Sequence, residues 1–310
     1  MLKKYLADFL ALFLVLFLAL GSLFLWPNAL SLAANEAPAI EGVRVVPSPL
    51  DRGTAGLVEL AKGGADCAGE FTGRLIFFFE DQKENRAPGR DPGTRWVGLF
   101  GADITLKPGT YPLTVTCPGF KAQTLKVTVR DKSYGVRNIK VPAKQVDLSP
   151  EDQARAAQEK VLTDKALATV SPVRLWSGAF LEPVNGSVNS SFGRQTRLNG
   201  ILNPRPHAGA DFLTPIGTPV KAPAKGQVIL EGDHFFSGKA IYIDHGQGLI
   251  SMYFHLSEIL VSSGAMVDKG QVIGKTGQTG RVTGPHLHYG VYLNGARIDP
   301  IPFRKLTTQF

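Results

Sequence analysis

The chain has 310 residues, of which 44% are hydrophobic and 19% are charged, and this composition excludes a chain that is disordered throughout or that crosses a membrane many times. At about 150 residues per domain, the length corresponds to two domains. The 34 Lys and Arg residues against 26 Asp and Glu residues give a net charge of +8. Because 13 of the basic and 8 of the acidic residues lie from Pro172 onward, the positive excess is spread along the chain and forms no basic arm, and we expect no nucleic-acid partner.

The first 34 residues are predicted to be a signal peptide or a membrane anchor. After Lys3 and Lys4, residues 9–26 are all apolar or small, and as a helix they would nearly span a membrane. The two lysines favour an N-terminus in the cytoplasm, so we expect everything after about Pro27 to be extracytoplasmic, in the periplasm or cell envelope. The small residues Ser31, Ala33 and Ala34 suit cleavage, which would give a secreted protein, whereas an uncleaved segment would anchor the chain to the inner membrane.

The chain has two cysteines, Cys67 and Cys117, which are too few for a disulfide framework or for a four-cysteine zinc site. They could form one disulfide or remain two buried thiols. Because disulfides persist in oxidising compartments, the expected export favours a bridge between them. Closing such a loop would stabilise the fold by roughly 4 kcal/mol in the chain-entropy model.

Residues 40–145 are predicted to form an immunoglobulin-like β-sandwich. Short runs rich in β-branched and aromatic residues alternate with Pro-Gly turns, and several such strands in about 100 residues are typical of this fold. The segment contains no histidine, so we expect a spacer or binding module without catalytic residues. Its predicted strands are 43–46, 74–79, 96–100, 111–116 and 125–129.

A connector helix is predicted over residues 149–170. Ser149 suits the N-cap, Pro150 suits the first helical position, and Glu151 and Asp152 lie in the first turn, where acids meet the positive end of the helix. Its apolar stripe is thin, so we expect the helix to lie lightly on one domain.

Residues 172–310 are predicted to form a second all-β domain, an antiparallel sheet with glycine-rich turns. All six histidines of the chain lie in it, so we expect any chemistry to occur there. Its predicted strands are 226–230, 240–243, 249–255, 272–274 and 286–293.

Three motifs in this domain carry candidate functional groups. His286 and His288 are two residues apart on a predicted strand, so their side chains point to the same face. His207 and Asp211 can converge across a turn or an extended segment, and His255 ends an apolar strand. Each motif alone is weak evidence, since a histidine on a strand is commonly structural.

Together these residues supply the groups of a catalytic zinc site. Such a site has three protein ligands and one open position, and His207, Asp211 and His288 provide that count for one Zn2+ per chain. A metal held this way lowers the pKa of a bound water and polarises a carbonyl. His255 and His286 are then unliganded imidazoles that serve as catalytic acid and base, with the roles between them left open. The predicted chemistry is metal-assisted hydrolysis of an amide.

At these residues the sequence resembles the lysostaphin-type (LytM-like) zinc metallopeptidases, which cleave peptide cross-links of bacterial peptidoglycan. The resemblance covers about Leu181 to Pro300, and all five site residues occur in the order of the family. It implies zinc-ligand roles for His207, Asp211 and His288, and catalytic roles for His255 and His286. Further matching segments are 191–194, 223–228, 244–246, 253–256, 270–277 and 283–288.

The remaining two histidines are not assigned to the zinc site, and two residues of the matching segment differ from the residue that is common in the family. His245 matches a frequent family position and is expected to line the groove, whereas His234 matches none. Ser251 stands where Thr is common and Gly290 where an acid is common. Neither is expected to touch the metal, although Gly290 could alter a contact that tunes His288.

The predicted function is an extracytoplasmic zinc-dependent endopeptidase that hydrolyses peptide cross-links of peptidoglycan, with the bond between D-alanine and a diamino acid preferred over a glycine bridge. Expected partners are peptidoglycan, a regulatory protein of the cell envelope, and the membrane if the first segment is uncleaved. The charge of the chain fits the acidic groups of this substrate.

Two other functions are compatible with parts of the sequence. Some members of the family have lost zinc ligands and act as non-enzymatic activators of other cell-wall hydrolases, but here no ligand is missing. The extra domain and linker leave an autoinhibited scaffold open, which predicts greater activity for a form that starts at about Leu175. A lipoyl-type carrier is disfavoured because no convincing lysine lies on a tight hairpin between matching strands.

Overall fold

A computed structural model of the chain describes residues 37–81, 95–140, 148–189 and 192–310, and it confirms a fold that is predominantly β, with two helices in these residues. The elements of the first half are β1 (Arg44–Val46), β2 (Leu50–Asp51), β3 (Thr54–Leu60), β4 (Ala68–Phe71), β5 (Arg74–Asp81), β6 (Arg95–Ala102), β7 (Gly109–Thr116), β8 (Gln123–Arg130), β9 (Val136–Ile139) and α1 (Pro150–Leu167). Those of the second half are β10 (Ser187–Asn189), β11 (Gln195–Leu198), β12 (Ile201–Leu202), β13 (Gly209–Leu213), β14 (Pro219–Lys221), β15 (Gly226–His234), β16 (Gly238–Asp244), β17 (Leu249–Ile259), β18 (Met266–Val267), β19 (Val272–Thr276), β20 (Leu287–Leu293), β21 (Ala296–Ile298) and α2 (Pro300–Thr307).

The N-terminal targeting segment predicted at residues 1–34 lies outside the described residues. Residues Ala37–Phe310 form one compact unit. In the part of the chain that the structure describes, neither helix is long and apolar enough to cross a membrane.

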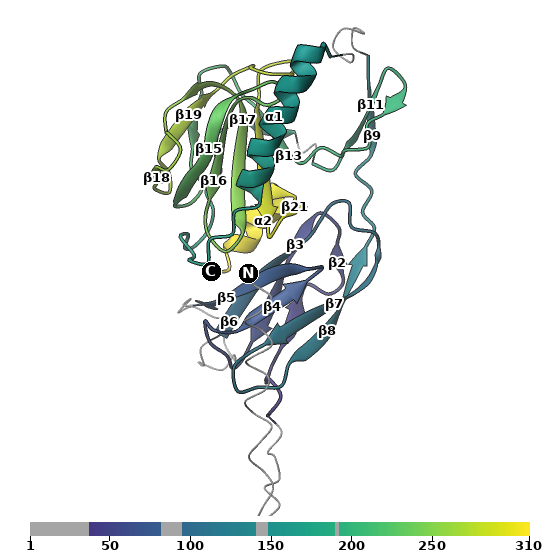
Figure 1. The fold of residues 1–310 in the computed structure, drawn as a ribbon, viewed down its shortest axis with the longest axis vertical. Coiled ribbons are helices and arrows are strands. Elements are labelled where there is room, and N and C mark those ends of the chain that lie inside the picture. The colour runs from purple at the N-terminus through teal and green to yellow at the C-terminus, as the bar shows by residue number, and fades with distance from the viewer. Residues whose placement is uncertain (1–36, 82–94, 141–147, 190–191) are drawn as a thin grey trace, which may run out of the picture. The chain divides into compact units, whose positions relative to one another are not determined.

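The first eight strands form one sheet in the order β1-β3-β6-β5-β4-β7-β8-β2 (Figure 1). Strand β5 changes partner along its length, because its first half pairs with β4 and its second half with β6. The buried residues of this sheet pack in a core that contains Phe71, Phe78 and Phe100. A disulfide joins Cys67 and Cys117 in this core, which confirms the predicted bridge. The immunoglobulin-like topology stays a prediction.

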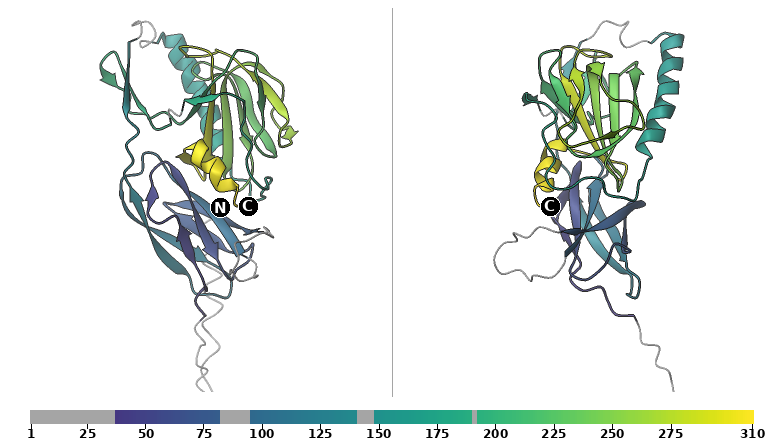
Figure 2. Two further views of the ribbon diagram at one scale, coloured as in Figure 1. Left: turned by 180° about the vertical axis from the view of Figure 1, so that it is seen from behind. Right: turned by 90° about the vertical axis from the view of Figure 1, so that its left-hand side faces the viewer.

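A ten-stranded antiparallel sheet follows, with β10-β13-β20-β17-β16-β15-β18 as its main order and β14, β19 and β21 paired alongside. Helix α1 lies against β15, as the three views of Figures 1 and 2 show. Ser149 Oγ accepts a hydrogen bond from Asp152 N at 3.1 Å, which confirms the predicted N-cap. Ala166 is the one buried residue of the helix, so apolar packing holds α1 to the sheet only weakly. Polar contacts to the sheet also hold it in place. In one of these, Glu159 Oε2 accepts a hydrogen bond from Phe235 N at 2.7 Å.

The two large sheets share part of one hydrophobic core. Leu57, Val97 and Leu99 of the first sheet are buried in the same cluster as Trp176 and Phe303. Burying apolar surface of this kind contributes about 25 cal/mol per Å². The contact is therefore part of the folded core, and the domain boundaries at about 145 and 172 stay a prediction.

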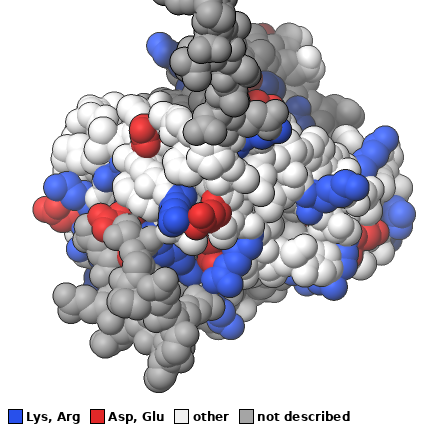
Figure 3. Space-filling model, turned by 90° about the horizontal axis from the view of Figure 1, so that it is seen from below, with Lys and Arg blue, Asp and Glu red and all other residues white. Residues whose placement is uncertain are grey.

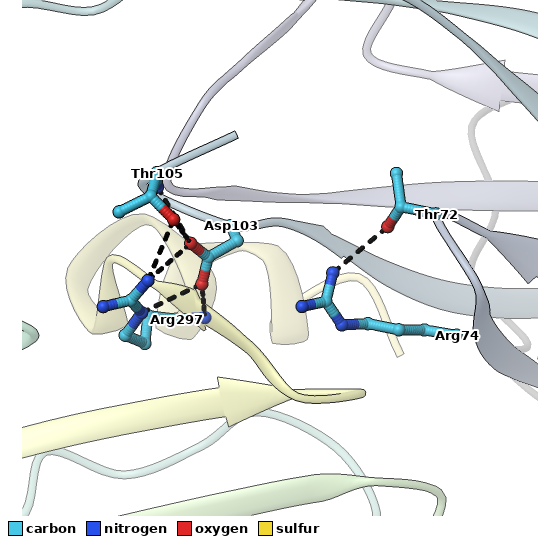
Figure 4. A network of polar contacts seen from close by, with 5 residues as sticks. All are labelled: Thr72, Arg74, Asp103, Thr105 and Arg297. Carbon is cyan, nitrogen blue, oxygen red and sulfur yellow. Dashed lines mark hydrogen bonds and ion pairs between the residues drawn. The ribbon is translucent and has the colours of Figure 1, made fainter. Parts of the chain in front are cut away.

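An ion pair between Asp103 and Arg297 also joins the two large sheets (Figure 4). Arg297 in β21 grips the Asp103 carboxylate after β6, with Nε 2.9 Å from Oδ2 and Nη2 2.7 Å from Oδ1. The Arg297 backbone N–H also donates to Oδ2 at 2.9 Å, and the Thr105 N–H donates to Oδ1 at 2.8 Å. Burial alone would raise the pKa of Asp103, but these hydrogen bonds lower it to about 2.

A small third sheet in the order β12-β11-β9 joins the segment that follows β8, here called the linker (residues 131–140), to the second half of the chain. Strand β9 follows the first large sheet and runs parallel to β11, with Arg137 opposite Thr196. Tyr134, just before β9, donates from its hydroxyl to Arg52 O at 2.6 Å and packs its ring against Phe192 at 5.6 Å. The linker therefore has a defined position beside the segment that leads to the first predicted ligand.

Candidate metal centre

Strand pairing brings two of the predicted ligands face to face. Strands β13 and β20 are antiparallel neighbours, and Asp211 lies directly opposite His288 in their register. Directly opposite residues of an antiparallel pair project on the same face, about 5 Å apart at Cβ. Asp211 Oδ1 is accordingly 3.1 Å from His288 Nδ1.

His207 reaches the same point from the loop before β13, where its Nε2 lies 3.3 Å from Asp211 Oδ1. Its backbone is held on both sides by residues of the sequence motif, because His207 N donates to Arg194 O at 3.0 Å and His207 O accepts from Gly193 N at 2.7 Å. Gly193 has a φ of +78° and lies against the Tyr134 ring, where a Cβ would be 2.2 Å from Cγ. Only glycine fits there, which explains this part of the motif.

The three side chains offer ligand atoms that all lie within 4.8 Å of one another. Burial would raise the pKa of Asp211, but hydrogen bonds from His207 and His288 outweigh it and hold the pKa well below its usual range. Burial lowers the pKa of His288 to about 4, so this imidazole is neutral at pH 7. Two imidazoles and one carboxylate form a donor set that catalytic zinc sites use, so these residues fit a metal.

His255 and His286 lie beside this cluster, with ring centroids 4.8 Å apart. His255 Nδ1 donates to Thr279 O at 3.0 Å, and His286 Nδ1 donates to Gly284 O at 2.8 Å. In each ring the carbonyl fixes the proton on Nδ1 and leaves the Nε2 lone pair available. Burial lowers the pKa of His255 to about 3, which keeps this imidazole neutral.

The backbone of His255 has an unusual conformation, with a φ of +65°. The pairing of β17 with β16 shifts register there, since Tyr253 is opposite Ile241 and Leu256 is opposite Lys239. This bulge turns the imidazole away from its position in a regular strand, and His255 N is satisfied by Ser237 O at 2.8 Å. Strained backbone of this kind is concentrated at functional sites.

Close packing fixes the orientation of the His288 ring. The Phe254 ring stacks on it with an interplanar angle of 3° and centroids 5.1 Å apart. Gly209 lies on the adjacent strand, and a Cβ there would be 2.6 Å from His288 Nε2. At Gly290, the departure from the family pattern, a Cβ would be 2.5 Å from Met252 Cε and 3.8 Å from His288 Nε2.

All five predicted site residues line one cavity of about 550 Å³. Apolar rings form part of its wall, among them Phe236 and Phe254. The sequence did not predict Arg137, which reaches the cavity from β9 and precedes the segment of family resemblance. In the described residues, neither strands β1–β8 nor helix α1 contribute to the lining.

The prediction that His245 lines the groove is wrong. His245 is 0% exposed and lies outside the cavity lining. Its Nδ1 donates to Lys225 O at 2.8 Å, and its Nε2 is 2.7 Å from Ser251 Oγ. Ser251 Oγ in turn is 2.8 Å from the Tyr253 hydroxyl, so Ser251 supplies the hydroxyl of a buried structural network.

Known proteins are similar to this chain in sequence and in fold. Residues 205–300 match the model of peptidase family M23. Peptidoglycan DD-endopeptidase ShyA of Vibrio cholerae is 47% identical over 94 residues, which are 30% of this chain and 22% of ShyA. Peptidoglycan DD-endopeptidase ShyB of the same organism is 31% identical over 226 residues, which are 65% of this chain and 52% of ShyB. The chain thus spans about half or less of the length of these relatives.

One solved structure covers nearly the whole described fold. A crystal structure of a peptidase M23 from Pseudomonas aeruginosa has 34% sequence identity and a TM-score of 0.66, and the match covers 84% of this chain and 96% of that one. The match extends well beyond the segment with the metal-centre residues. By sequence and by fold, the chain belongs to the M23 family of metallopeptidases.

Proposed function

We propose that the chain is an extracytoplasmic zinc-dependent endopeptidase that hydrolyses peptide cross-links of peptidoglycan, at the bond between D-alanine and a diamino acid. The observation that carries the proposal is the convergence of three ligand-type side chains and two unliganded imidazoles on one cavity. The names of the relatives, which are peptidoglycan DD-endopeptidases, support the substrate and the bond.

His207, Asp211 and His288 would hold the zinc. When bound, zinc supplies Lewis-acid chemistry, because it lowers the pKa of a water molecule and polarises the scissile carbonyl. His255 and His286 act on protons through Nε2: one ring accepts the proton that the attacking water loses and then gives that proton to the leaving amine as the C–N bond breaks, while the other ring orients the water. The carbonyl acceptors on their Nδ1 atoms leave Nε2 of each ring for this work.

Two features support a location outside the cytoplasm. The chain has both of its cysteines in a disulfide, and disulfides persist in oxidising compartments. The apolar segment at residues 9–26 has the composition of an export signal or membrane anchor.

The complete ligand set argues against a non-enzymatic activator. Occlusion by the first sheet or by α1 has no support in the cavity lining, and a form starting at Leu175 would lose the core contacts of Leu57 and Val97. We therefore expect such a truncation to reduce stability rather than to increase activity.

Digestion of purified peptidoglycan, followed by mass spectrometry of the released fragments, tests the proposal. We expect new D-alanine carboxyl ends and new diamino-acid amines. The variants His255→Asn and His286→Ala should lose turnover and keep the metal, and Asn is chosen at position 255 because it tolerates a positive φ. Fragments cut in the glycan strand, or full turnover by both variants, would contradict the proposal.

A further inference from the structure

Arginines are concentrated in the cavity of the candidate metal centre. Arg137, Arg205 and Arg281 all line it, and the one acidic residue in the described lining is the predicted ligand Asp211. On the face seen in Figure 3, by contrast, many basic residues lie beside acidic residues or are separated by uncharged surface. Within the described residues none of the three arginines forms an ion pair with a carboxylate. The cavity is therefore positively charged before any metal is bound.

Arg137 is fixed by one side-chain hydrogen bond and by the strand pairing of the residues around it. Its Nε donates to Thr196 Oγ1 at 2.9 Å across the β9–β11 pair. Two residues further on, the parallel ladder continues to Ile139 opposite Leu198, and before β9 Gln195 N donates to Gly135 O at 3.0 Å. Because the contact to Thr196 uses only Nε, the two terminal nitrogens of the guanidinium keep their donors.

The other two arginines are attached to different segments. Arg281 packs over the Phe236 ring at 4.5 Å, and its backbone N donates to Phe236 O at 3.0 Å. Arg205 follows β12, and its backbone N donates to Asn203 Oδ1 at 3.0 Å. Arg281 is thus partly committed to an aromatic contact and Arg205 is exposed, whereas Arg137 is half-buried on a strand. Of the three, Arg137 is the one whose guanidinium makes a side-chain hydrogen bond within the described residues.

We propose that Arg137 recognises a free carboxylate of the peptide substrate and so makes the enzyme selective for the acid over the amide form of that peptide. A guanidinium fixed through Nε presents its terminal donors in a plane, and this geometry matches the two oxygens of a carboxylate. Partial burial strengthens the contact relative to one at an open surface. The inference rests on the proposed function, and it assigns substrate selectivity to the linker strand β9, which lies outside the segment matched by the family model.

The test uses two soluble cross-linked peptide dimers that differ only in whether the carboxyl groups beside the scissile bond are free acids or carboxamides. The variants are Arg137→Gln and, as matched control, Arg197→Gln, because Arg197 lies on the neighbouring strand β11 and outside the cavity lining. The kcat/KM of each protein for each peptide is measured. Binding of both peptides to the His286→Ala protein, with and without Arg137→Gln, is measured by calorimetry.

We expect the wild type to prefer the acid by about 10- to 100-fold, the range for a hydrogen bond to a charged group. Arg137→Gln should abolish this preference by lowering kcat/KM for the acid alone, and Arg197→Gln should retain it. An equal loss on both peptides would assign Arg137 a structural role and overturn the proposal, as would a preference that survives Arg137→Gln.

The binding data separate this inference from the proposed function. If the wild type cleaves neither peptide but His286→Ala binds the acid more tightly, and Arg137→Gln removes that difference, only the proposed activity is overturned. If neither peptide is cleaved and both are bound equally, both proposals are overturned.

Discussion

The contact between Asp103 and Arg297 gives the sharpest prediction about stability, because one charge can be removed almost without change of shape (Figure 4). In Asp103→Asn the amide keeps the size of the carboxylate but loses its charge. The folded protein lowers the pKa of Asp103 from 3.8 to about 2. At 1.36 kcal/mol for each pKa unit, this corresponds to about 2 kcal/mol of stability at pH 7.

The sign of the pH dependence follows from the lowered pKa. Stability from a carboxylate with a depressed folded pKa is fully present above the unfolded pKa and is lost as the pH falls through the folded one. The difference between the wild type and Asp103→Asn should therefore be largest above pH 3.8 and vanish near pH 2. Urea unfolding at a series of pH values, followed by circular dichroism, measures it.

Arg74→Gln is the control, since Arg74 donates to Thr72 Oγ1 at 3.1 Å within one turn and has no acidic partner among the described residues. It should cost less than about 0.5 kcal/mol, because it breaks no ion pair and leaves no buried charge unpaired. A double-mutant cycle of Asp103→Asn with Arg297→Gln should show strong non-additivity. A loss for Asp103→Asn below about 0.5 kcal/mol at pH 7, or a loss of equal size at pH 2, would refute the reasoning.

Three further predictions concern the disulfide, a metal ligand and a buried histidine. Replacing Cys67 and Cys117 by Ser opens a loop with a sequence separation of 50 and should lower the free energy of unfolding by about 4 kcal/mol, and unchanged urea midpoints would contradict this. Gly209→Ala places a Cβ 2.6 Å from His288 Nε2, so zinc affinity in a competitive chelator titration should fall by about 10-fold or more, and wild-type affinity would contradict the assigned geometry. Burial lowers the pKa of His245 from 6.5 to about 4. The unfolded chain then binds the extra proton in this range, so stability should fall by up to about 3 kcal/mol between pH 6.5 and pH 4, and His245→Gln should flatten that slope.

The sequence placed His286 and His288 on one predicted strand, and both line the cavity, but strand β20 begins at Leu287 and His286 pairs with Gly277 in an isolated bridge, so strand periodicity alone does not bring the two together. It also predicted the helix that starts at Ser149, since capping is a local property. The residues that pair across strands, such as Asp211 with His288, were predicted as a set, and their register was supplied by the structure.

Other features depend on tertiary context. His245 has the sequence surroundings of a groove residue, but its burial is decided by the packing of Phe180 and Ser251 around it. The positive φ of His255 results from a bulge that no residue pattern marked. Arg137 lies 70 residues before His207 in a linker, and only the parallel pairing of β9 with β11 brings it to the cavity.

The C-terminal helix and three early strands were also missed. Helix α2 spans only Pro300–Thr307 and is capped by Asp299. A helix of this length is too short to show a periodic apolar pattern in the sequence. Strands β2, β3 and β4 are either very short or contain glycine and charged residues, as in β4 (Ala68–Phe71). Such strands are stabilised by their neighbours in the sheet more than by their own propensity.

The central claim is that His207, Asp211 and His288 hold a zinc ion that is needed to cleave peptidoglycan peptides. Measuring zinc per chain and peptide release from peptidoglycan on the same preparation, for the wild type and His288→Ala, tests it most directly. We predict about one zinc per wild-type chain, as expected for a single three-ligand site, and loss of both metal and cleavage in the variant. Undiminished cleavage by a zinc-free His288→Ala protein would contradict the account.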